Sequence, residues 1–189
     1  MSTTTETPNT VINGVNVGDV TCLIHEIDSG QRAGVAGFRS RTVWKGGLSS
    51  TSYIDGWTLD GEDQPHEFAV DIDEPCGLAG ADDSPNPQEF LLSALNACVL
   101  NTFVAYCSVM GVELERVEVR SNGELDLHGF LNLDQSVNPG YDNVHYTIAV
   151  KGKGTPEQFK QVHELVKRTS PNFANFARAI TMNPRLVVE

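Results

Sequence analysis

One long apolar stretch, residues 86–111, constrains the fold of this chain more than any other feature. Asn86 is a good N-cap, because its side-chain oxygen can accept hydrogen bonds from free backbone N–H groups. Pro87 follows at the first helical position, where a missing N–H costs nothing. Glu89 completes a capping-box pattern, and Gly111 can take the left-handed conformation that ends a helix. The stretch therefore predicts a helix of about 24 residues, roughly 36 Å long.

The predicted helix is apolar around most of its circumference. Glu89 is its single charged residue, and no Lys or Arg occurs between Ser84 and Val112. A helix of this kind is buried. Polar residues interrupt it too often for a membrane span. We therefore expect the core helix of a soluble protein, with Cys98 near its middle, and no membrane partner.

Composition argues against several classes of partner. The chain of 189 residues carries a formal net charge of −12 and a pI near 4.7, which argues against nucleic acid and anionic membranes as partners. No secretory leader pattern opens the sequence, so the cytoplasm is the expected compartment. The four cysteines form no CxxC pair, and we expect neither a metal nor a cofactor.

The pattern of the remaining elements is mixed. Residues 1–34 are predicted to form a polar N-terminal tail and a short amphipathic helix at 19–27, with the folded domain at 35–189. A second helix is expected from Thr155, with Gln158 as capping-box partner, and Ser170-Pro171 ends it. Alternation and turn residues predict strands at 36–44, 49–54, 66–72, 112–120, 125–131, 144–151 and 178–188, with an acidic loop at 60–64 and a hairpin turn at Asn122-Gly123.

This order indicates an α+β fold built on antiparallel hairpins. Its motifs also resemble a known family. The segments PNPQEFLLSALNAC, GVELERVEVRSNGELDLHGFL and TPEQF…RTSP are similar to those of the OsmC/Ohr family of bacterial hydroperoxide reductases. The most specific part is the proline-led helix with a cysteine eleven residues after the proline. The acidic DEP loop and the LDLHGFL segment place the chain closer to the OsmC-like branch than to the proven peroxidases.

The resemblance implies an intertwined homodimer, in which antiparallel sheets wrap around the paired long helices. The nearly all-apolar helix agrees with this, because one small sheet from its own chain gives it too little cover. We therefore expect a large apolar interface between two copies of the chain.

The resemblance also implies thiol chemistry. Cys98 matches the family's attacking cysteine, which reduces an organic hydroperoxide and becomes a sulfenic acid. Ser170 takes the place of the resolving cysteine before proline. The family's glutamate after the helix proline is Gln88 here, with Glu89 one step late. Its arginine has no direct match, and Arg41 or Arg39 from the first strand is the candidate substitute, with His66 nearer the expected place.

Two functions follow as alternatives. The first is reduction of a small organic hydroperoxide through Cys98, assisted by Gln88, Arg41 and Glu89, with an external thiol reductant as resolver. Cys76, in the loop before the helix, is a possible internal resolver. The second is a non-catalytic OsmC-like dimer that binds a small hydrophobic ligand in the cleft between subunits. A purely structural module is a weaker third interpretation.

Overall fold

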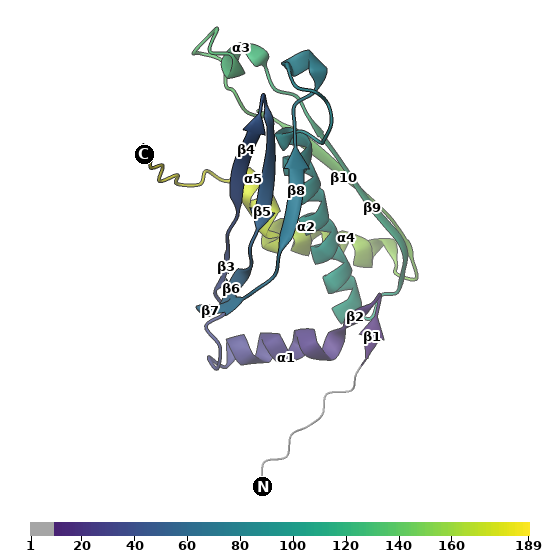
Figure 1. Cartoon of the computed structure of the whole chain (residues 1–189). Helices are drawn as coiled ribbons and strands as arrows, with labels where there is room; N and C mark the ends of the chain where they lie inside the picture. The colour runs from purple at the N-terminus through teal and green to yellow at the C-terminus, as the bar shows by residue number, and fades with distance from the viewer. Residues whose placement is uncertain (1–9) are drawn as a thin grey trace. The chain divides into compact units, whose positions relative to one another are not determined.

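The computed structural model describes residues 10–189, and residues 1–9 of the predicted N-terminal tail lie outside the described part (Figure 1). The chain forms two compact units. Among the described residues, the first contains 10–11 and 16–91, and the second contains 12–15 and 92–189. The long helix α2 begins in the first unit and continues through the second. The division between residues 34 and 35 expected from the sequence stays a prediction.

The first unit contains helix α1 and two small antiparallel sheets. Helix α1 (Val17–Asp28) confirms the predicted amphipathic helix, and the side chain of Asn16 caps it by accepting from the N–H groups of Gly18 and Asp19. One sheet has the order β4-β5-β8 and the other β3-β6-β7. Their strands are β3 (Ala36–Phe38), β4 (Arg41–Gly46), β5 (Ser49–Ile54), β6 (Trp57–Leu59), β7 (Glu62–Gln64) and β8 (Phe68–Ile72).

Two predictions for the first unit need correction. The single strand expected at 36–44 is interrupted at residues 39–40, and its two parts, β3 and β4, belong to different sheets. The acidic loop expected at 60–64 is a hairpin between β6 and β7. Its turn is Asp60-Gly61, whose positive φ angles of 52° and 85° match the type of turn that joins two antiparallel strands tightly.

The DEP loop that leads to α2 is held together by Asp73. Its carboxylate is buried and accepts hydrogen bonds from the N–H groups of Ala81 (3.0 Å) and Asp83 (3.4 Å). A backbone hydrogen bond from Glu74, together with these contacts, lowers the pKa of Asp73. The loop also contains a 3₁₀ turn, η1 (Cys76–Leu78).

Helix α2 (Pro87–Val109) confirms the prediction of a long helix at this position. The side chain of Glu89 accepts from the N–H of Asn86, and the side chain of Asn86 accepts from the N–H of Glu89, both at 2.8 Å. Gly111 ends the segment with φ of 72°. The capping signals in the sequence therefore placed both ends of the helix correctly.

The hydrophobic core lies in the second unit. There α2 packs with the antiparallel pair β9 (Leu114–Gly123) and β10 (Val144–Gly152) and with α4 (Pro156–Thr169). Helix α5 (Pro171–Ala177) follows α4 directly. The fully enclosed apolar residues are Leu95, Val99, Phe103, Cys107, Val112, Val162 and Val166. All seven belong to this unit, whereas the buried side chains described in the first unit, those of Thr51 and Asp73, are polar.

A short hairpin, whose turn belongs to the second unit, lies at the start of the described residues. Its strands are β1 (Val11–Ile12) and β2 (Val15–Asn16), with Asn13-Gly14 at the turn. The Asn13 side chain donates to Ser108 Oγ (3.1 Å) and to the carbonyl of Val112 (2.9 Å). These bonds tie the turn to the end of α2.

Three predictions for the second unit are wrong. Asn122-Gly123 does not form a hairpin turn, because β9 continues through both residues and Gly123 lies opposite Val144 of β10. The return strand expected at 125–131 is instead a short helix, α3 (Leu127–Phe130), capped by Asp126. The strand expected at 178–188 has no regular structure.

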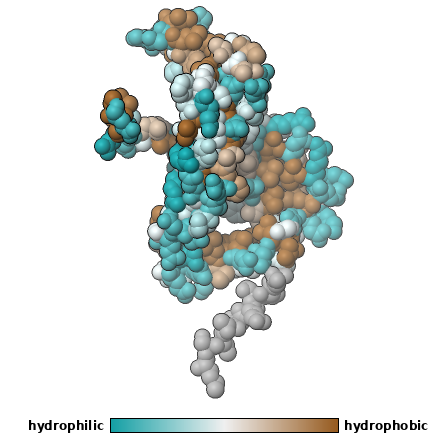
Figure 2. All heavy atoms as spheres, viewed as in Figure 1, coloured by the Kyte–Doolittle hydropathy of each residue, from teal (hydrophilic) through white to brown (hydrophobic). Residues whose placement is uncertain are grey.

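Several large apolar residues remain on the surface of the described chain (Figure 2). On α2 itself, Leu91 and Val109 are 43% and 42% exposed. The fold class is nevertheless as expected: α+β, with antiparallel sheets and a long central helix. Helix α2 is also long and apolar enough to cross a membrane by length and composition alone, a test that the core helix of a soluble protein passes equally.

Candidate functional site

Cys98 lies in the middle of α2 and is half-buried. Two hydrogen-bond donors point at its sulfur. The hydroxyl of Ser170 donates across 3.3 Å, and the backbone N–H of Asn172 donates across 3.5 Å. Both donors come from the junction between α4 and α5, 72 and 74 residues further along the chain. The sulfur therefore has two polar contacts beside the apolar core of its unit.

Local sequence explains why the junction has this shape. The N–H of Ser170 bonds to the carbonyl of Val166 (2.9 Å) and closes α4. Pro171 then starts α5, because proline cannot continue α4 but fits the first turn of a new helix. The side chain of Asn172 donates to the carbonyl of Ala94 (2.9 Å), which fixes the start of α5 against α2.

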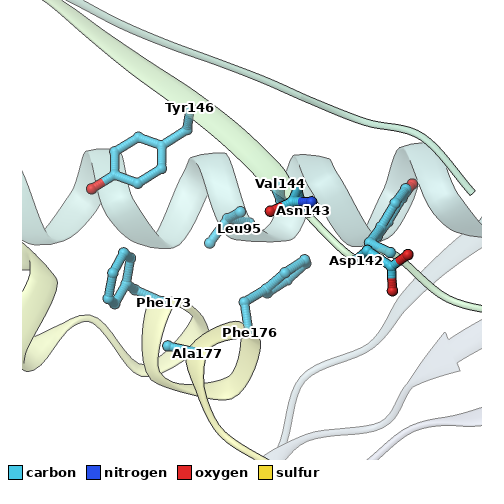
Figure 3. Close-up of a pocket in the computed structure, with 9 residues that line it drawn as sticks. Leu95, Asp142, Asn143, Val144, Tyr146, Phe173, Phe176 and Ala177 are labelled. Atoms are coloured by element: carbon cyan, nitrogen blue, oxygen red, sulfur yellow. The ribbon is translucent and has the colours of Figure 1, made fainter.

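An aromatic cavity of about 230 Å³ begins one helical turn from Cys98 (Figure 3). Leu95, three residues before Cys98, forms part of its wall, and Phe173 directly follows Asn172. Figure 3 shows Leu95 of α2 between Tyr146 on one side and Phe173 and Phe176 on the other. The full lining is Leu95, Tyr141, Asp142, Asn143, Val144, Tyr146, Phe173, Phe176 and Ala177. Asp142 is the charged residue in that lining.

Tyr146 connects the cavity to a second titratable side chain. Its ring meets Phe173 edge-on at 6.1 Å, and its hydroxyl shares a hydrogen bond of 2.8 Å with Nε2 of His163. Burial raises the pKa of Tyr146, and the nearby carboxylate of Glu164 raises it further. Burial also raises the pKa of Tyr141. Both phenols therefore stay neutral at physiological pH.

The sequence matches a known protein family. A family model described as OsmC-like protein matches residues 80–185, more than half of the chain. The chain belongs to the OsmC-like protein family. No curated protein sequence matches it.

Solved structures show the same fold. An OsmC-like protein from Mycoplasma pneumoniae has a TM-score of 0.58 at 15% identity, covering 74% of this chain and 86% of that one. A protein from Psychrobacter arcticus named for an osmotic stress and detoxification response has a TM-score of 0.55 at 14% identity, with coverage of 72% and 85%. An OsmC-like protein of unknown function from Vibrio cholerae has a TM-score of 0.51 at 14% identity, with coverage of 73% and 92%.

The arginines proposed for this OsmC-like site have partners within the first unit. Nε of Arg41 lies 3.0 Å from the carboxylate of Asp55, and its guanidinium stacks 4.0 Å above the ring of Tyr53. Arg39 pairs with Asp63 at 2.9 Å. The ring of His66 packs against Phe68, with 5.0 Å between the ring centres. A role for Arg41 beside Cys98 stays a prediction.

Gln88 and Glu89 lie at the start of α2. The carboxylate of Glu89 is engaged in the capping box with Asn86, which is the structural role that an acid at this position usually has. Gln88 lies ten residues before Cys98, about 15 Å along the helix axis. The helix therefore keeps both residues away from the sulfur of their own chain, and their catalytic roles also stay predictions.

The other cysteines differ from Cys98 in their surroundings. Cys76 lies in η1, is exposed and donates from its thiol to the carbonyl of Ala81 (3.7 Å). Cys22 is exposed on α1. Cys107 is completely buried, and burial raises its pKa to about 11. Among residues 10–189, no group of three His, Cys, Asp or Glu side chains is placed to hold a metal ion.

The sequence indicates Cys98 and Ser170 as site positions, but it does not indicate that Ser170 donates a hydrogen bond to the sulfur. The donor role of Ser170 and that of the Asn172 N–H were not predicted, nor was the Tyr146–His163 pair. The one available signal was Ser170-Pro171, a helix stop that turns the chain back toward α2. Nothing local in the sequence identifies the residue of α2 that faces this stop.

Proposed function

We propose that this OsmC-like protein reduces organic hydroperoxides through Cys98, with an external thiol as the resolving reductant. The observation that carries the proposal is the pair of donors on the Cys98 sulfur, from Ser170 and Asn172, beside an aromatic cavity. A half-buried cysteine that packs only for stability needs no such donors.

The chemistry uses the sulfur as a two-electron donor. The Cys98 thiolate attacks the terminal oxygen of the hydroperoxide, an S–O bond forms as the O–O bond breaks, and the leaving alkoxide takes a proton to become an alcohol. An external thiol then displaces water from the sulfenic acid and forms a mixed disulfide. A second external thiol releases Cys98 and leaves as the oxidised disulfide.

The aromatic cavity suits the organic part of such a substrate. A dry cavity of about 150 Å³ is enough to hold benzene. The cavity of about 230 Å³ in this protein can therefore take one ring with a short substituent, or a branched alkyl group. Phe173 and Phe176 offer the apolar walls, and Leu95 places the group one turn from the sulfur.

We further propose that the protein is a homodimer and works in the cytoplasm. Two observations support the dimer. The described residues of the first unit include no buried apolar side chain, and Leu91 and Val109 of the apolar helix α2 are exposed in the single chain. Gln88 of the partner subunit would then complete the site. Analytical ultracentrifugation should give twice the 20.5 kDa of one chain, and a 20.5 kDa species at micromolar concentration would contradict the dimer.

The decisive experiment is consumption of cumene hydroperoxide with dithiothreitol as reductant. Cys98→Ser should lower the rate by about a hundredfold or more, because it removes the nucleophile. Cys107→Ser is the matched control, a second cysteine on the same helix, and its specific activity should stay close to wild type. Equal rates for wild type and Cys98→Ser would rule out peroxide reduction through Cys98.

Disulfide mapping distinguishes the two resolvers. After one equivalent of peroxide without reductant, the external-thiol mechanism leaves Cys98 as a sulfenic acid that dimedone can trap. An internal mechanism leaves a Cys76–Cys98 disulfide. If Cys76 stays free while Cys98 is oxidised, Cys76 is not the resolver.

The alternative is a non-catalytic dimer that binds a small hydrophobic ligand. The same cavity favours it, together with the two hydrogen-bond donors at the Cys98 sulfur, which are both neutral. It predicts a Cys98 that reacts slowly with water-soluble thiol reagents in the native protein. Rapid labelling at neutral pH would count against this alternative.

A further inference from the structure

The side chain of Ser170 is built into the Cys98 site more firmly than a helix-stop residue requires. Ser170 is 1% exposed. Its N–H bonds to the carbonyl of Val166 and its carbonyl accepts from the N–H of Ala174, so the backbone is satisfied without the hydroxyl. The hydroxyl points instead at the sulfur of Cys98, 3.3 Å away. A buried hydroxyl costs free energy unless it is hydrogen bonded, so this contact is a specific one.

We propose that Ser170 is a positioning residue for Cys98, and that its hydroxyl and the Asn172 N–H together form a neutral cradle for the charged sulfur. The role of these two donors in catalysis rests on the proposed peroxide chemistry. In that chemistry the cradle stabilises the thiolate before attack and then holds the sulfenic acid. Hydrogen bonds to charged groups are the stronger kind, so two of them contribute more to the thiolate than to the neutral thiol.

On the helices around Cys98, the charged groups pair with other residues or are exposed. On α2 the single charge is Glu89, engaged at the helix start. On α4, the ammonium of Lys167 pairs with Glu164 at 2.7 Å, and Arg168 is exposed. Helix α5 carries no ionisable side chain, and on β10 the phenol of Tyr146 is bonded to His163. The hydrogen-bond donors that this unit places at the Cys98 sulfur are therefore neutral.

Ser170 also determines what happens after oxidation. A hydroxyl cannot condense with a sulfenic acid to form a disulfide, so the oxidised sulfur stays available to a thiol from outside. A thiol at the same position would lie close to Cys98, because the present Oγ–Sγ distance is 3.3 Å and a disulfide needs about 2.05 Å. In Ser170→Cys, the sulfenic acid and the introduced thiol would lose one water and form a disulfide.

The experiment first measures how fast the Cys98 sulfur is alkylated in the absence of peroxide. Alkylation of Cys98 by iodoacetamide is followed by mass spectrometry over a range of pH in wild type, Ser170→Ala and the control Thr169→Ala. The Thr169 hydroxyl neighbours Ser170 but bonds to the carbonyl of Leu165 (2.8 Å). Ser170→Ala should slow alkylation at neutral pH about tenfold and move the rise in rate to higher pH, because one donor to the charged form is lost. Thr169→Ala should leave the alkylation rate at neutral pH and its pH dependence unchanged.

The second arm uses Ser170→Cys with one equivalent of cumene hydroperoxide. We expect a disulfide between positions 98 and 170 and no dimedone adduct, whereas wild type gives the adduct. Wild-type alkylation in a folded Ser170→Ala protein, or a dimedone adduct without disulfide in Ser170→Cys, would overturn the proposal. A slowed Ser170→Ala alkylation combined with no peroxide consumption would uphold the cradle and reject the peroxidase, because alkylation needs no peroxide.

Discussion

Cys98 and Cys107 lie nine residues apart on the same helix, yet their surroundings are opposite. Cys98 is half-buried, and Ser170 and Asn172 donate to its sulfur. Cys107 has no exposed surface and lies in the apolar core with Phe103 and Val162. The two sulfurs therefore differ in what the partner elements bring to them, hydrogen-bond donors in one case and apolar side chains in the other. We expect their reactivity to differ accordingly.

The largest expected consequence of this difference is selective alkylation of Cys98 over Cys107. With a pKa of about 11, only about three in ten thousand Cys107 thiols are ionised at pH 7.5. The core also blocks access to the sulfur. Iodoacetamide at pH 7.5 should therefore modify Cys98 at least about a hundredfold faster than Cys107 in the native protein. Peptide mass mapping over time measures both rates, with urea-unfolded protein as the control in which the two rates converge. Equal native rates would contradict the comparison.

A smaller effect concerns stability at alkaline pH. The thiol of Cys107 ionises near its ordinary pKa of 9.0 in the unfolded chain but near 11 in the folded protein. Between these values the folded state binds more protons, so stability is fully present below pH 9 and falls as the pH rises toward 11. The loss should be about 2–3 kcal/mol. Urea unfolding at a series of pH values measures it.

Other groups, including the tyrosines, also titrate in this range, so Cys107→Ala is the necessary reference. The free energy of unfolding of wild type relative to Cys107→Ala should decline between pH 9 and 11. A parallel decline in both proteins would show that Cys107 is not responsible.

The two Asn-Gly pairs show how far local sequence determines this fold. Asn13-Gly14, with φ angles of 53° and 79°, forms the turn between β1 and β2. Asn122-Gly123 lies within β9 instead. A Cβ atom at position 123 would come within 2.8 Å of the Tyr141 ring, so this glycine serves close packing and not a turn. Pairing with β10, which follows some twenty residues later, overrides the turn preference.

Distance along the chain also separates the predictions that held from those that did not. Caps are local, so the ends of α2 and the start of α4 at Thr155 followed from a few neighbouring residues. A strand needs a partner, and the alternating segment 178–188 has none in the single chain described. At the site, Cys98 was found through its place on a recognisable helix. Its contact with Ser170 spans 72 residues, and no local pattern encodes such a distance.

Serine substitution at the two cysteines should separate them by stability. Cys107→Ser places a hydroxyl in an apolar core and should cost about 1–3 kcal/mol. Cys98→Ser keeps a polar atom beside two existing donors, and it should cost less than about 0.5 kcal/mol. Thermal and urea unfolding of both variants at pH 7.5 measure the difference. Similar losses for both would mean that the surroundings of the two sulfurs are less different than the contacts indicate.

The smallest effect tests how rigidly the donors are held at Cys98. The Asn172 side chain bonds to the carbonyl of Ala94 and fixes the start of α5, while its backbone N–H is the donor to the sulfur. Asn172→Ala keeps that N–H but loosens its support, so alkylation of Cys98 should slow about two- to fivefold while that of Cys107 is unchanged. Asn175→Ala is the matched control, because the Asn175 side chain bonds only to that of Asn172, at 3.4 Å, among the described contacts. If Asn172→Ala leaves Cys98 as reactive as wild type, the Asn172 side chain is not needed to hold the donor in place. If both variants slow it equally, the effect belongs to α5 as a whole.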